Sequence, residues 1–395
     1  MEINKRNGDE TSAAELQYSL DTEERRLTFI DKQYPTPELR KKYDEYREEW
    51  KLREREHYPG NKPLSVTCEL VSICNLQCSM CYTINESWQQ RVVGTQRIMP
   101  WSMVTAIIDE CALLGVPSML FSWRGEPTLY KHSGKDLGDV LQYAHNAGIL
   151  EITFSTNGRK SDANLTQKIV DAEPNWINFS VDGLDDTYNK IRKSRIDDFD
   201  DGLTPFSRVA INIYNMIAYR NFCGKTRPQI RTNTIYPAIV EYPDNYYKFM
   251  KNVLEVDWIT TNMLVNFRNG EFSDDELNKD FVCSFPFQRM TIAANGFMYP
   301  CASCEDEDIE IVIGKYPGAK NKIINLDGRN IIFSPKTLTI AEAWHSAWFK
   351  AVRDCHKRGD RLNLPVCRRC ERGIKSAPVT CIPKDWDMEN MRWRE

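Results

Sequence analysis

Hydrophobic positions change their period repeatedly between residues 65 and 266. Short runs of β-branched and aromatic residues predict strands, and apolar residues spaced three or four apart predict helices. Six predicted strands alternate with helices, and the strands are SVTCELVS, SMLFSW, EITFSTNG, WINFSVDG, QIRTNTIY and WITTNMLVN. This alternation predicts an α/β fold with a parallel sheet and helices outside it. Whether the sheet closes into a barrel stays open, but either way the chemistry belongs at the carboxyl ends of the strands.

The two flanking segments lack this alternation. In the first segment PELRKKYDEYREEWKLREREHYPG predicts a solvated helix ended by Pro59-Gly60, which we expect to pack loosely behind a frayed N-terminus. Short antiparallel strands are predicted over 283–316 and 323–340 around a turn at Asn295-Gly296, followed by one helix, IAEAWHSAWFKAVRDCH. The predicted domains are a charged helical N-terminal extension, 1–62, the α/β body, 63–270, and a smaller C-terminal domain, 271–395.

Composition narrows the class of protein. The chain has 395 residues, 41% of them hydrophobic, which is typical of a globular protein with a substantial core. Its 52 basic and 56 acidic residues give a net charge of −4, which predicts no general affinity for nucleic acid or an anionic membrane. No apolar run is long enough to span a bilayer, and the N-terminus lacks the apolar core of a signal peptide. We therefore expect a cytoplasmic protein.

The thirteen cysteines are the strongest chemical signal. Cys74, Cys78 and Cys81 lie within eight residues, directly after the first predicted strand. A structural zinc site needs four ligands, usually in two pairs, so three thiolates leave a metal with an exchangeable position. Iron–sulfur clusters are the usual occupants of such closely spaced thiolates, and a zinc site completed by a distant ligand is the alternative. Small buried hydrophobic roles are expected for Cys68, Cys111 and Cys223.

The spacing Cys74-x3-Cys78-x2-Cys81 resembles the signature of the radical S-adenosylmethionine (radical SAM) superfamily. The resemblance implies a partial (β/α)6 TIM-like barrel, in agreement with the six repeats. It also implies a [4Fe-4S] cluster whose open iron binds S-adenosylmethionine (SAM). Reductive cleavage of SAM then yields a 5′-deoxyadenosyl radical that abstracts hydrogen from the substrate, with flavodoxin or ferredoxin as electron donor. This chemistry belongs to the cofactors, which the protein binds and orients.

Further motifs lie where that superfamily would place them. Arg124 to Pro127 resembles its glycine–glycine–glutamate motif, with Arg124 in place of the first glycine. By this resemblance Glu126 accepts hydrogen bonds from the SAM ammonium and Gly125 allows close backbone approach. Ser180 would contact the ribose and Arg192, twelve residues on, the carboxylate. The implied cofactor-binding residues are Met80, beside the adenine, Gly125, Glu126, Asn157 of STNG, Ser180 and Arg192.

A second set of cysteines occupies the C-terminal part. From spacing alone it could hold zinc or a second cluster. It resembles the α+β SPASM and twitch domains, but Ser376 and Thr380 stand where the full SPASM pattern continues with cysteines. This departure implies one auxiliary [4Fe-4S] cluster, with Cys283, Cys301, Cys367 and Cys370 as its ligands. The bystanders would then be Cys304, Cys355 and Cys381.

A closed auxiliary cluster suits acceptance of an electron from a substrate radical. The resemblance to twitch-bearing aminocyclitol dehydrogenases implies a two-electron oxidation of a sugar or cyclitol alcohol. Modification of a ribosomal peptide is the alternative, although residues 1–62 show no strand pattern for a leader-binding module. Epimerisation would need a hydrogen donor such as Cys304 or Cys223, and a zinc-binding structural or interaction protein is the alternative from another class.

The catalytic base is not identified by the sequence. Sulfatase-maturing relatives carry an aspartate directly after the cysteine that corresponds to Cys301, and here the residue is Ala302. Trp123 and Arg124 could line the substrate pocket, with Arg124 suited to a phosphate or carboxylate. The candidates for the base are Glu69, Asp182, Arg268 and Glu305.

Overall fold

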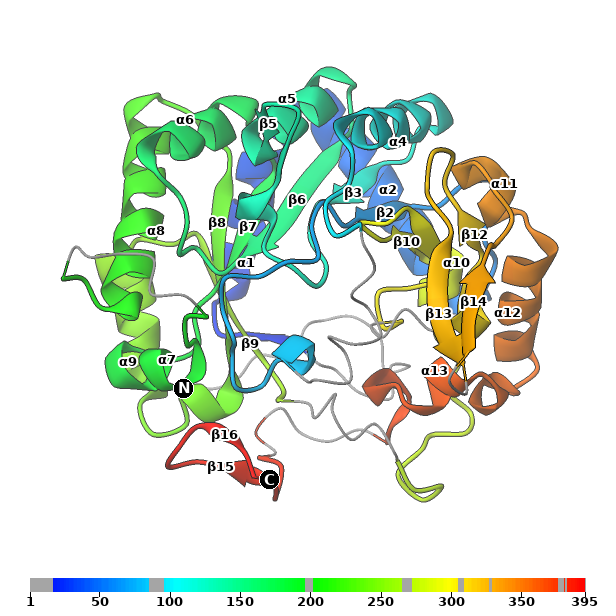
Figure 1. Cartoon of the computed structure of the whole chain (residues 1–395). Helices are drawn as coiled ribbons and strands as arrows, with labels where there is room; N and C mark the ends of the chain where they lie inside the picture. Colours follow the sequence, from blue (N-terminus) through cyan, green and yellow to red (C-terminus); the bar gives the residue numbers. More distant parts are fainter. Residues whose placement is uncertain are drawn as a thin grey trace.

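A computed structural model describes residues 17–84, 96–195, 202–264, 272–304, 309–326, 329–375, 380 and 382–394. Within these residues the central sheet runs β1-β9-β8-β7-β6-β3-β2-β10-β11-β12 (Figure 1). Its strands are β1 (Gln17–Ser19), β2 (Ser65–Cys68), β3 (Ser118–Leu120), β6 (Glu151–Thr156), β7 (Trp176–Ser180), β8 (Gln229–Ile235), β9 (Trp258–Asn262), β10 (Arg289–Ile292), β11 (Phe297–Tyr299) and β12 (Gly314–Lys315). Three two-stranded sheets pair β4 (Lys131–His132) with β5 (Lys135–Asp136), β13 (Lys322–Leu326) with β14 (Arg329–Phe333), and β15 (Trp386–Asp387) with β16 (Arg392–Trp393).

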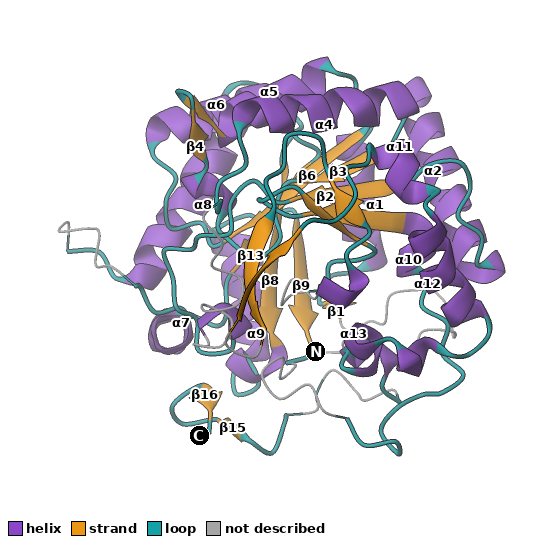
Figure 2. Ribbon diagram, turned by 45° about the vertical axis from the view of Figure 1, so that its right-hand side comes forward, coloured by secondary structure: helices purple, strands orange, loops and turns teal. Residues whose placement is uncertain are grey.

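The six predicted strands form a parallel partial barrel. The pairs β2–β3, β3–β6, β6–β7, β7–β8 and β8–β9 are all parallel, which confirms the predicted α/β fold. The helices that cover this part are α4 (Trp101–Leu114), α5 (Leu137–Asn146), α6 (Ala163–Ala172), α7 (Asp185–Ile191), α8 (Pro205–Phe222) and α9 (Pro243–Lys248) (Figure 2). The barrel stays open because β1 pairs with one outer strand, β9, and β10 pairs with the other, β2.

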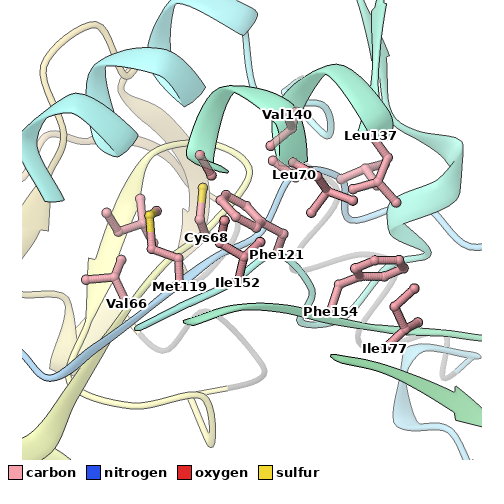
Figure 3. Packing of buried hydrophobic residues seen from close by; sticks show 14 of the residues in the cluster. Val66, Cys68, Leu70, Met119, Phe121, Leu137, Val140, Ile152, Phe154 and Ile177 are labelled. Carbon is pink, nitrogen blue, oxygen red and sulfur yellow. The ribbon is translucent and has the colours of Figure 1, made fainter. Parts of the chain in front are cut away.

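Alternation along the strands separates an apolar face from a polar one. The residues facing the helices include Val66, Cys68, Met119, Phe121, Ile152, Phe154 and Ile177, which pack with Leu137 and Val140 of α5 (Figure 3). The neighbouring positions in sequence are polar and include Thr67, Thr153, Asn178, Arg231, Asn233 and Thr260, all buried. Because successive side chains of a strand point to opposite faces, these residues line the inner side of the partial barrel. The inner side is therefore polar.

The N-terminal segment is not the loosely packed extension that its charge suggested. Its helices are α1 (Glu23–Gln33) and α2 (Pro37–Glu56), and β1 joins the main sheet through β9. Phe29 of α1 packs on Trp258 of β9, with ring centroids 5.0 Å apart. Arg53 of α2 is buried and donates to the backbone oxygens of Lys62, at 2.7 Å, and Phe287, at 3.2 Å. The buried side of each helix, rather than its average charge, decides how it packs. The first fifteen residues lie outside the described part.

The C-terminal part continues the main sheet before it separates. The antiparallel strands β10 and β11 are joined at Gly296, whose φ of 83° gives the predicted turn. The helices of the C-terminal part are α10 (Phe285–Gln288), α11 (Ile340–Trp344), α12 (Ala347–Lys357) and α13 (Pro365–Arg368). The single helix expected over IAEAWHSAWFKAVRDCH is thus two, because Ser346 caps α12 by accepting a hydrogen bond from the Phe349 N–H.

Candidate functional site

The loop with the first three cysteines leaves the carboxyl end of β2. Burial raises the pKa of the Cys74 and Cys78 thiols, that of Cys78 to about 11, and the neighbouring Cys81 adds to both shifts. The Arg192 guanidinium opposes the rise at Cys78, where Nη1 lies 3.7 Å from Sγ. The three thiols are therefore close neighbours, and the raised pKa values of Cys74 and Cys78 mean that these two keep their protons until a metal displaces them.

Gly125 fits against this loop because it has no side chain. A methyl group at Gly125 would overlap the backbone oxygens of Val71 and Ile73, and the next residue, Glu126, donates its N–H to the Ile73 oxygen at 2.9 Å. The end of β3 is thus pressed directly onto the segment that precedes Cys74. This close packing requires a residue without a side chain, and the role of Gly125 in binding the cofactor stays a prediction.

The Glu126 carboxylate accepts four hydrogen bonds within the protein. It accepts hydrogen bonds from the hydroxyls of Thr128 and Thr156 and from the Asn157 N–H, each at 2.7 Å, and from the Thr128 N–H at 3.1 Å. Burial raises its pKa, while these donors oppose the rise. These bonds tie the loop after β3 to the end of β6. Three of them go to Oε1 and one to Oε2, and the contact with the SAM ammonium stays a prediction.

Asn157 and Arg192, two of the other predicted SAM contacts, lie beside the same loop. The Asn157 side-chain amide donates to the Asn75 side chain at 2.9 Å and lies 3.9 Å from Cys74 Sγ. Ser180 ends β7, and Arg192 is the residue after α7. Arg192 pairs with Asp182 through Nε at 2.6 Å, and Asp182 also accepts the Ile235 N–H at 2.8 Å. Asp182 therefore positions Arg192 beside Cys78. Its carboxylate is engaged in this ion pair, whereas a general base needs a carboxylate that is free to take a proton.

Glu69 and Arg124 form a buried ion pair. Their side chains are fully buried, and Arg124 donates to Glu69 from Nε at 2.9 Å and from Nη2 at 2.6 Å. Glu69 also accepts the Ala294 N–H at 3.0 Å. Arg124 is thus engaged inside the protein, contrary to the expected anion-binding role, and Glu69 is not placed to receive a proton from a substrate. The ion pair instead joins the ends of β2 and β3 to the β10–β11 turn.

Arg159, a buried residue near the loop of Cys74 to Cys81, was not predicted from the sequence. Nη2 donates to Ser194 Oγ at 3.0 Å, but Nε and Nη1 have no hydrogen-bond partner in the described part of the chain. The hydroxyl of Tyr188 is likewise buried without a partner there, and it feels the charges of Arg192, Arg159 and Cys78. Unpaired buried cations are costly, so this region fits an anionic group, such as the SAM carboxylate beside a thiolate-bound cluster. An arginine after a TNG turn carries no signal that distinguishes it from a surface residue.

The four predicted auxiliary ligands also lie together. The Cys367 thiol, whose pKa is raised by burial, is close enough to Cys283, Cys301 and Cys370 to feel their charges. Among the described residues, however, no three His, Cys, Asp or Glu side chains converge closely enough to hold a single metal ion. The four thiols are thus gathered in one region without forming a ready single-ion site.

Three arginines lie near these thiols, Arg361 buried and Arg289 and Arg372 half-buried. The Nε atoms of Arg289, Arg361 and Arg372 are buried and, within the described ranges, have no hydrogen-bond partner. Burial, with Arg372 nearby, lowers the pKa of Arg289 to about 10. Such cations are stabilised by negative charge in their midst, which a cluster bound by four thiolates supplies. The residues therefore fit an auxiliary iron–sulfur cluster.

The cysteines that are not proposed ligands differ in how close they lie to the cluster sites. The Sγ atoms of Cys301 and Cys304 are 3.8 Å apart, so Cys304 lies beside the auxiliary site. Cys355 Sγ donates to the Asp360 oxygen at 3.0 Å. Cys223 follows α8 on the outer helical layer, which does not suit it as a hydrogen donor to substrate. The candidates Arg268, Glu305, Ser376 and Cys381 lie outside the described residues.

His356 links two of the predicted auxiliary ligands and was not expected from the sequence. Its Nδ1 accepts a hydrogen bond from the Cys283 N–H, with 3.4 Å between the two nitrogens. Its Nε2 lies 3.4 Å from Cys367 Sγ. Because Nδ1 is the acceptor, Nε2 carries the proton in the neutral ring and points a donor at sulfur. Burial lowers the pKa of His356 to about 4, so the ring is neutral near pH 7.

We expect His356→Phe to lower the reduction potential of the auxiliary cluster. Loss of an N–H donor to a ligating sulfur disfavours the more negative, reduced cluster by about 1 kcal/mol, or about 40 mV. The potential is measured by redox titration with EPR detection in protein that lacks Cys74, Cys78 and Cys81. His345→Phe, on the neighbouring α11–α12 junction, is the matched control, and equal potentials in both variants would contradict the assignment.

Comparisons with known proteins agree with the two-part arrangement. The family model for the radical SAM superfamily matches residues 68–220, and that for SPASM, an iron–sulfur cluster-binding domain, matches residues 283–371. The Fe-coproporphyrin III synthase of Methanosarcina barkeri is 31% identical over 131 residues, which are 33% of this chain and 30% of that protein. The probable GTP 3′,8-cyclase of Methanococcus maripaludis is 23% identical over 64% of this chain and 89% of that protein.

The fold is also similar to solved structures. A tagged form of anSMEcpe with bound AdoMet superposes with a TM-score of 0.51 at 13% identity, over 79% of this chain and 90% of that one. At this identity the likeness concerns the fold alone. In the described part of the chain, no helix is both long and apolar enough to cross a membrane.

Proposed function

Because the chain belongs to the radical SAM superfamily and carries a C-terminal SPASM domain, we propose that it oxidises an alcohol of a sugar-type or cyclitol-type substrate by two electrons. Its cofactors are SAM, a [4Fe-4S] cluster and an auxiliary iron–sulfur cluster. Bound SAM supplies a radical that abstracts hydrogen, and the clusters supply and accept single electrons. A zinc-binding structural protein is set aside, since both domains are those of iron–sulfur enzymes.

The observation that carries the proposal is the auxiliary site with four thiols and three arginines whose Nε atoms are buried. Four thiolate ligands leave no iron free to bind substrate, while the surrounding cations favour the extra negative charge of a reduced cluster. Such a site is suited to receiving an electron from a substrate radical. The residues proposed to hold it are Cys283, Cys301, Cys367 and Cys370, and those for the SAM cluster are Cys74, Cys78 and Cys81.

Trp123 joins the two sites. It lies directly before Arg124, and its indole N–H donates at 2.7 Å to the backbone oxygen of Ala302, the residue after Cys301. Its ring lies 5.8 Å from that of Tyr299. We place the substrate between the two sets of thiols, with Trp123 as one wall. The polar inner side of the barrel, where Arg231 donates to the Asn178 side chain at 2.9 Å, suits a substrate rich in hydroxyls.

Modification of a peptide is the second candidate function. The described part of residues 17–62 holds two helices and the short strand β1, which is no winged-helix leader-binding module. We therefore favour the small-molecule substrate, with reduced flavodoxin or ferredoxin as the donor in the cytoplasm. The base that takes the hydroxyl proton is not assigned, because Glu69 and Asp182 are engaged in ion pairs.

The proposal predicts a product lighter than its substrate by two hydrogens. Anaerobic, reduced enzyme is incubated with SAM and panels of sugars, cyclitols and peptides, and 5′-deoxyadenosine and product mass are measured. Cys367→Ala should still form 5′-deoxyadenosine but release little oxidised product, because the electron acceptor is impaired. An unchanged product mass would indicate epimerisation, and turnover of peptides alone would replace the proposed substrate class.

A further inference from the structure

The chain ends in a small hairpin beyond the matched SPASM segment. Its strands β15 and β16 have two residues each, and the turn between them is closed by Asp387, which accepts the N–H groups of Glu389 and Asn390 at 3.0 Å (Figure 1). An isolated two-stranded hairpin is marginally stable at best. The position of this C-terminal hairpin, residues 383–394, therefore depends on the surface that it covers.

That surface is the carboxyl end of the barrel beside the first cysteine loop. Trp386 and Trp393 are 2% and 4% exposed, and their rings meet edge to face with centroids 5.0 Å apart. They form a buried cluster separate from the main core, against which Met80 packs. Its other members are Ile191, Ile235, Ala238, Leu264 and Met391. Ile191 ends α7, Ile235 ends β8 and Leu264 follows β9, so the hairpin covers the carboxyl ends of β8 and β9 and the end of α7.

Hydrogen bonds fix the hairpin to the cysteine loop itself. Ser79, which stands between Cys78 and Met80, donates its hydroxyl to the Met391 backbone oxygen at 2.5 Å. Its N–H donates to the Ile191 oxygen at 2.9 Å. Lys190 Nζ donates to the Glu389 oxygen at 3.2 Å. The hairpin, the end of α7 and the loop that carries the first three cysteines thus form one connected unit.

Two donors in this unit have no acceptor. The indole Nε1 atoms of Trp386 and Trp393 are buried, and neither has a hydrogen-bond partner among the residues that the structure describes. A buried N–H without a partner costs free energy, and in a folded protein it calls for an explanation. A ligand that brings acceptor atoms to the edge of this cluster of indole rings and methionine side chains would supply the missing partners. Adenosine has these properties, because its flat ring carries several acceptor nitrogens.

We propose that the C-terminal hairpin forms one wall of the SAM site and that the Trp386 and Trp393 indoles donate hydrogen bonds to the adenosyl group. The inference deepens the proposed function, since it rests on the loop from Cys74 to Cys81 as the site of the SAM-binding cluster. It adds residues from the chain end to a site otherwise built from the barrel. The docked hairpin also shields that side of the site from water.

The test is ligand affinity, measured without turnover. Trp386→Phe combined with Trp393→Phe keeps two aromatic rings and removes both N–H donors. Equilibrium dialysis of the anaerobically reconstituted enzyme should show affinity for SAM reduced by about tenfold or more, and affinity for 5′-deoxyadenosine reduced by a similar factor. Trp348→Phe, on the partly exposed face of α12, is the matched control and should leave both affinities unchanged.

A second measurement covers the case in which the double variant folds poorly. In the wild-type enzyme, SAM should slow hydrogen exchange of the amides in residues 383–394, and Ser79→Ala should reduce this protection. Unchanged affinities in the double variant, a loss for SAM without one for 5′-deoxyadenosine, or exchange unaffected by SAM would each overturn the inference. Wild-type enzyme that fails to bind SAM at all would instead overturn the proposed function.

Discussion

Replacing Cys74, Cys78 and Cys81 together by alanine is expected to abolish reductive cleavage of SAM. These thiols are the proposed ligands of the cluster whose open iron binds SAM, and they lie together at the carboxyl end of β2 with Arg192 beside Cys78. The variant should keep about four of about eight irons per chain, because the auxiliary site is built from other residues. Iron analysis and 5′-deoxyadenosine release under anaerobic reduction measure both effects.

Controls separate the loss of a cluster from the loss of a thiol. Cys223→Ala removes a thiol at the end of α8 and should keep both the iron content and the cleavage of SAM. The triple variant should also keep the far-UV circular dichroism of the wild type, because the three side chains belong to a loop. Continued cleavage of SAM by the triple variant would remove the basis of the proposed site.

Arg124→Met is expected to destabilise the fold by about 3–5 kcal/mol. Glu69 would keep its carboxylate in a fully buried position and lose the two guanidinium hydrogen bonds at 2.9 and 2.6 Å. An uncompensated buried charge costs more than the pair itself contributes, so the double variant Glu69→Gln, Arg124→Met should recover part of the loss. Denaturant-induced unfolding of the three proteins under anaerobic conditions measures the difference in free energy.

An exposed ion pair provides the comparison. Arg26→Met removes the partner of Glu23 on the surface of α1, and such pairs contribute less than about 1 kcal/mol. If Arg124→Met cost no more than Arg26→Met, or if the double variant were no more stable than the single one, the structural role given to the Glu69–Arg124 pair would be wrong.

The local patterns were enough to predict the framework. The period-two runs identified the six parallel strands, because each strand presents its own alternation of polar and apolar positions. The spacing of Cys74, Cys78 and Cys81 pointed to a cluster loop, since ligands so close in sequence can meet without help from the fold. Gly125 was assigned through the resemblance of Arg124 to Pro127 to a superfamily motif, and the structure places it tightly against the segment before Cys74.

Side-chain roles that depend on distant partners were not predictable in this way. Glu69 and Arg124 looked like candidates for a base and an anion site, yet 55 positions apart they form a closed ion pair. Glu126 was predicted from a local motif to contact the cofactor, but its hydrogen bond to the end of β6 could not be read from that motif. The sequence around an acidic residue or an arginine does not indicate whether its side chain forms a buried ion pair or stays free.

The sequence by itself determined the class of fold and the loop chemistry, because alternation and spacing are properties of neighbouring residues. Only the tertiary structure decided that β1 completes the sheet at β9, that His356 bridges Cys283 and Cys367, and that the C-terminal hairpin docks beside Met80. Each of these contacts joins segments far apart in the chain. Their formation depends on the whole core bringing those segments together, and no local pattern encodes that requirement.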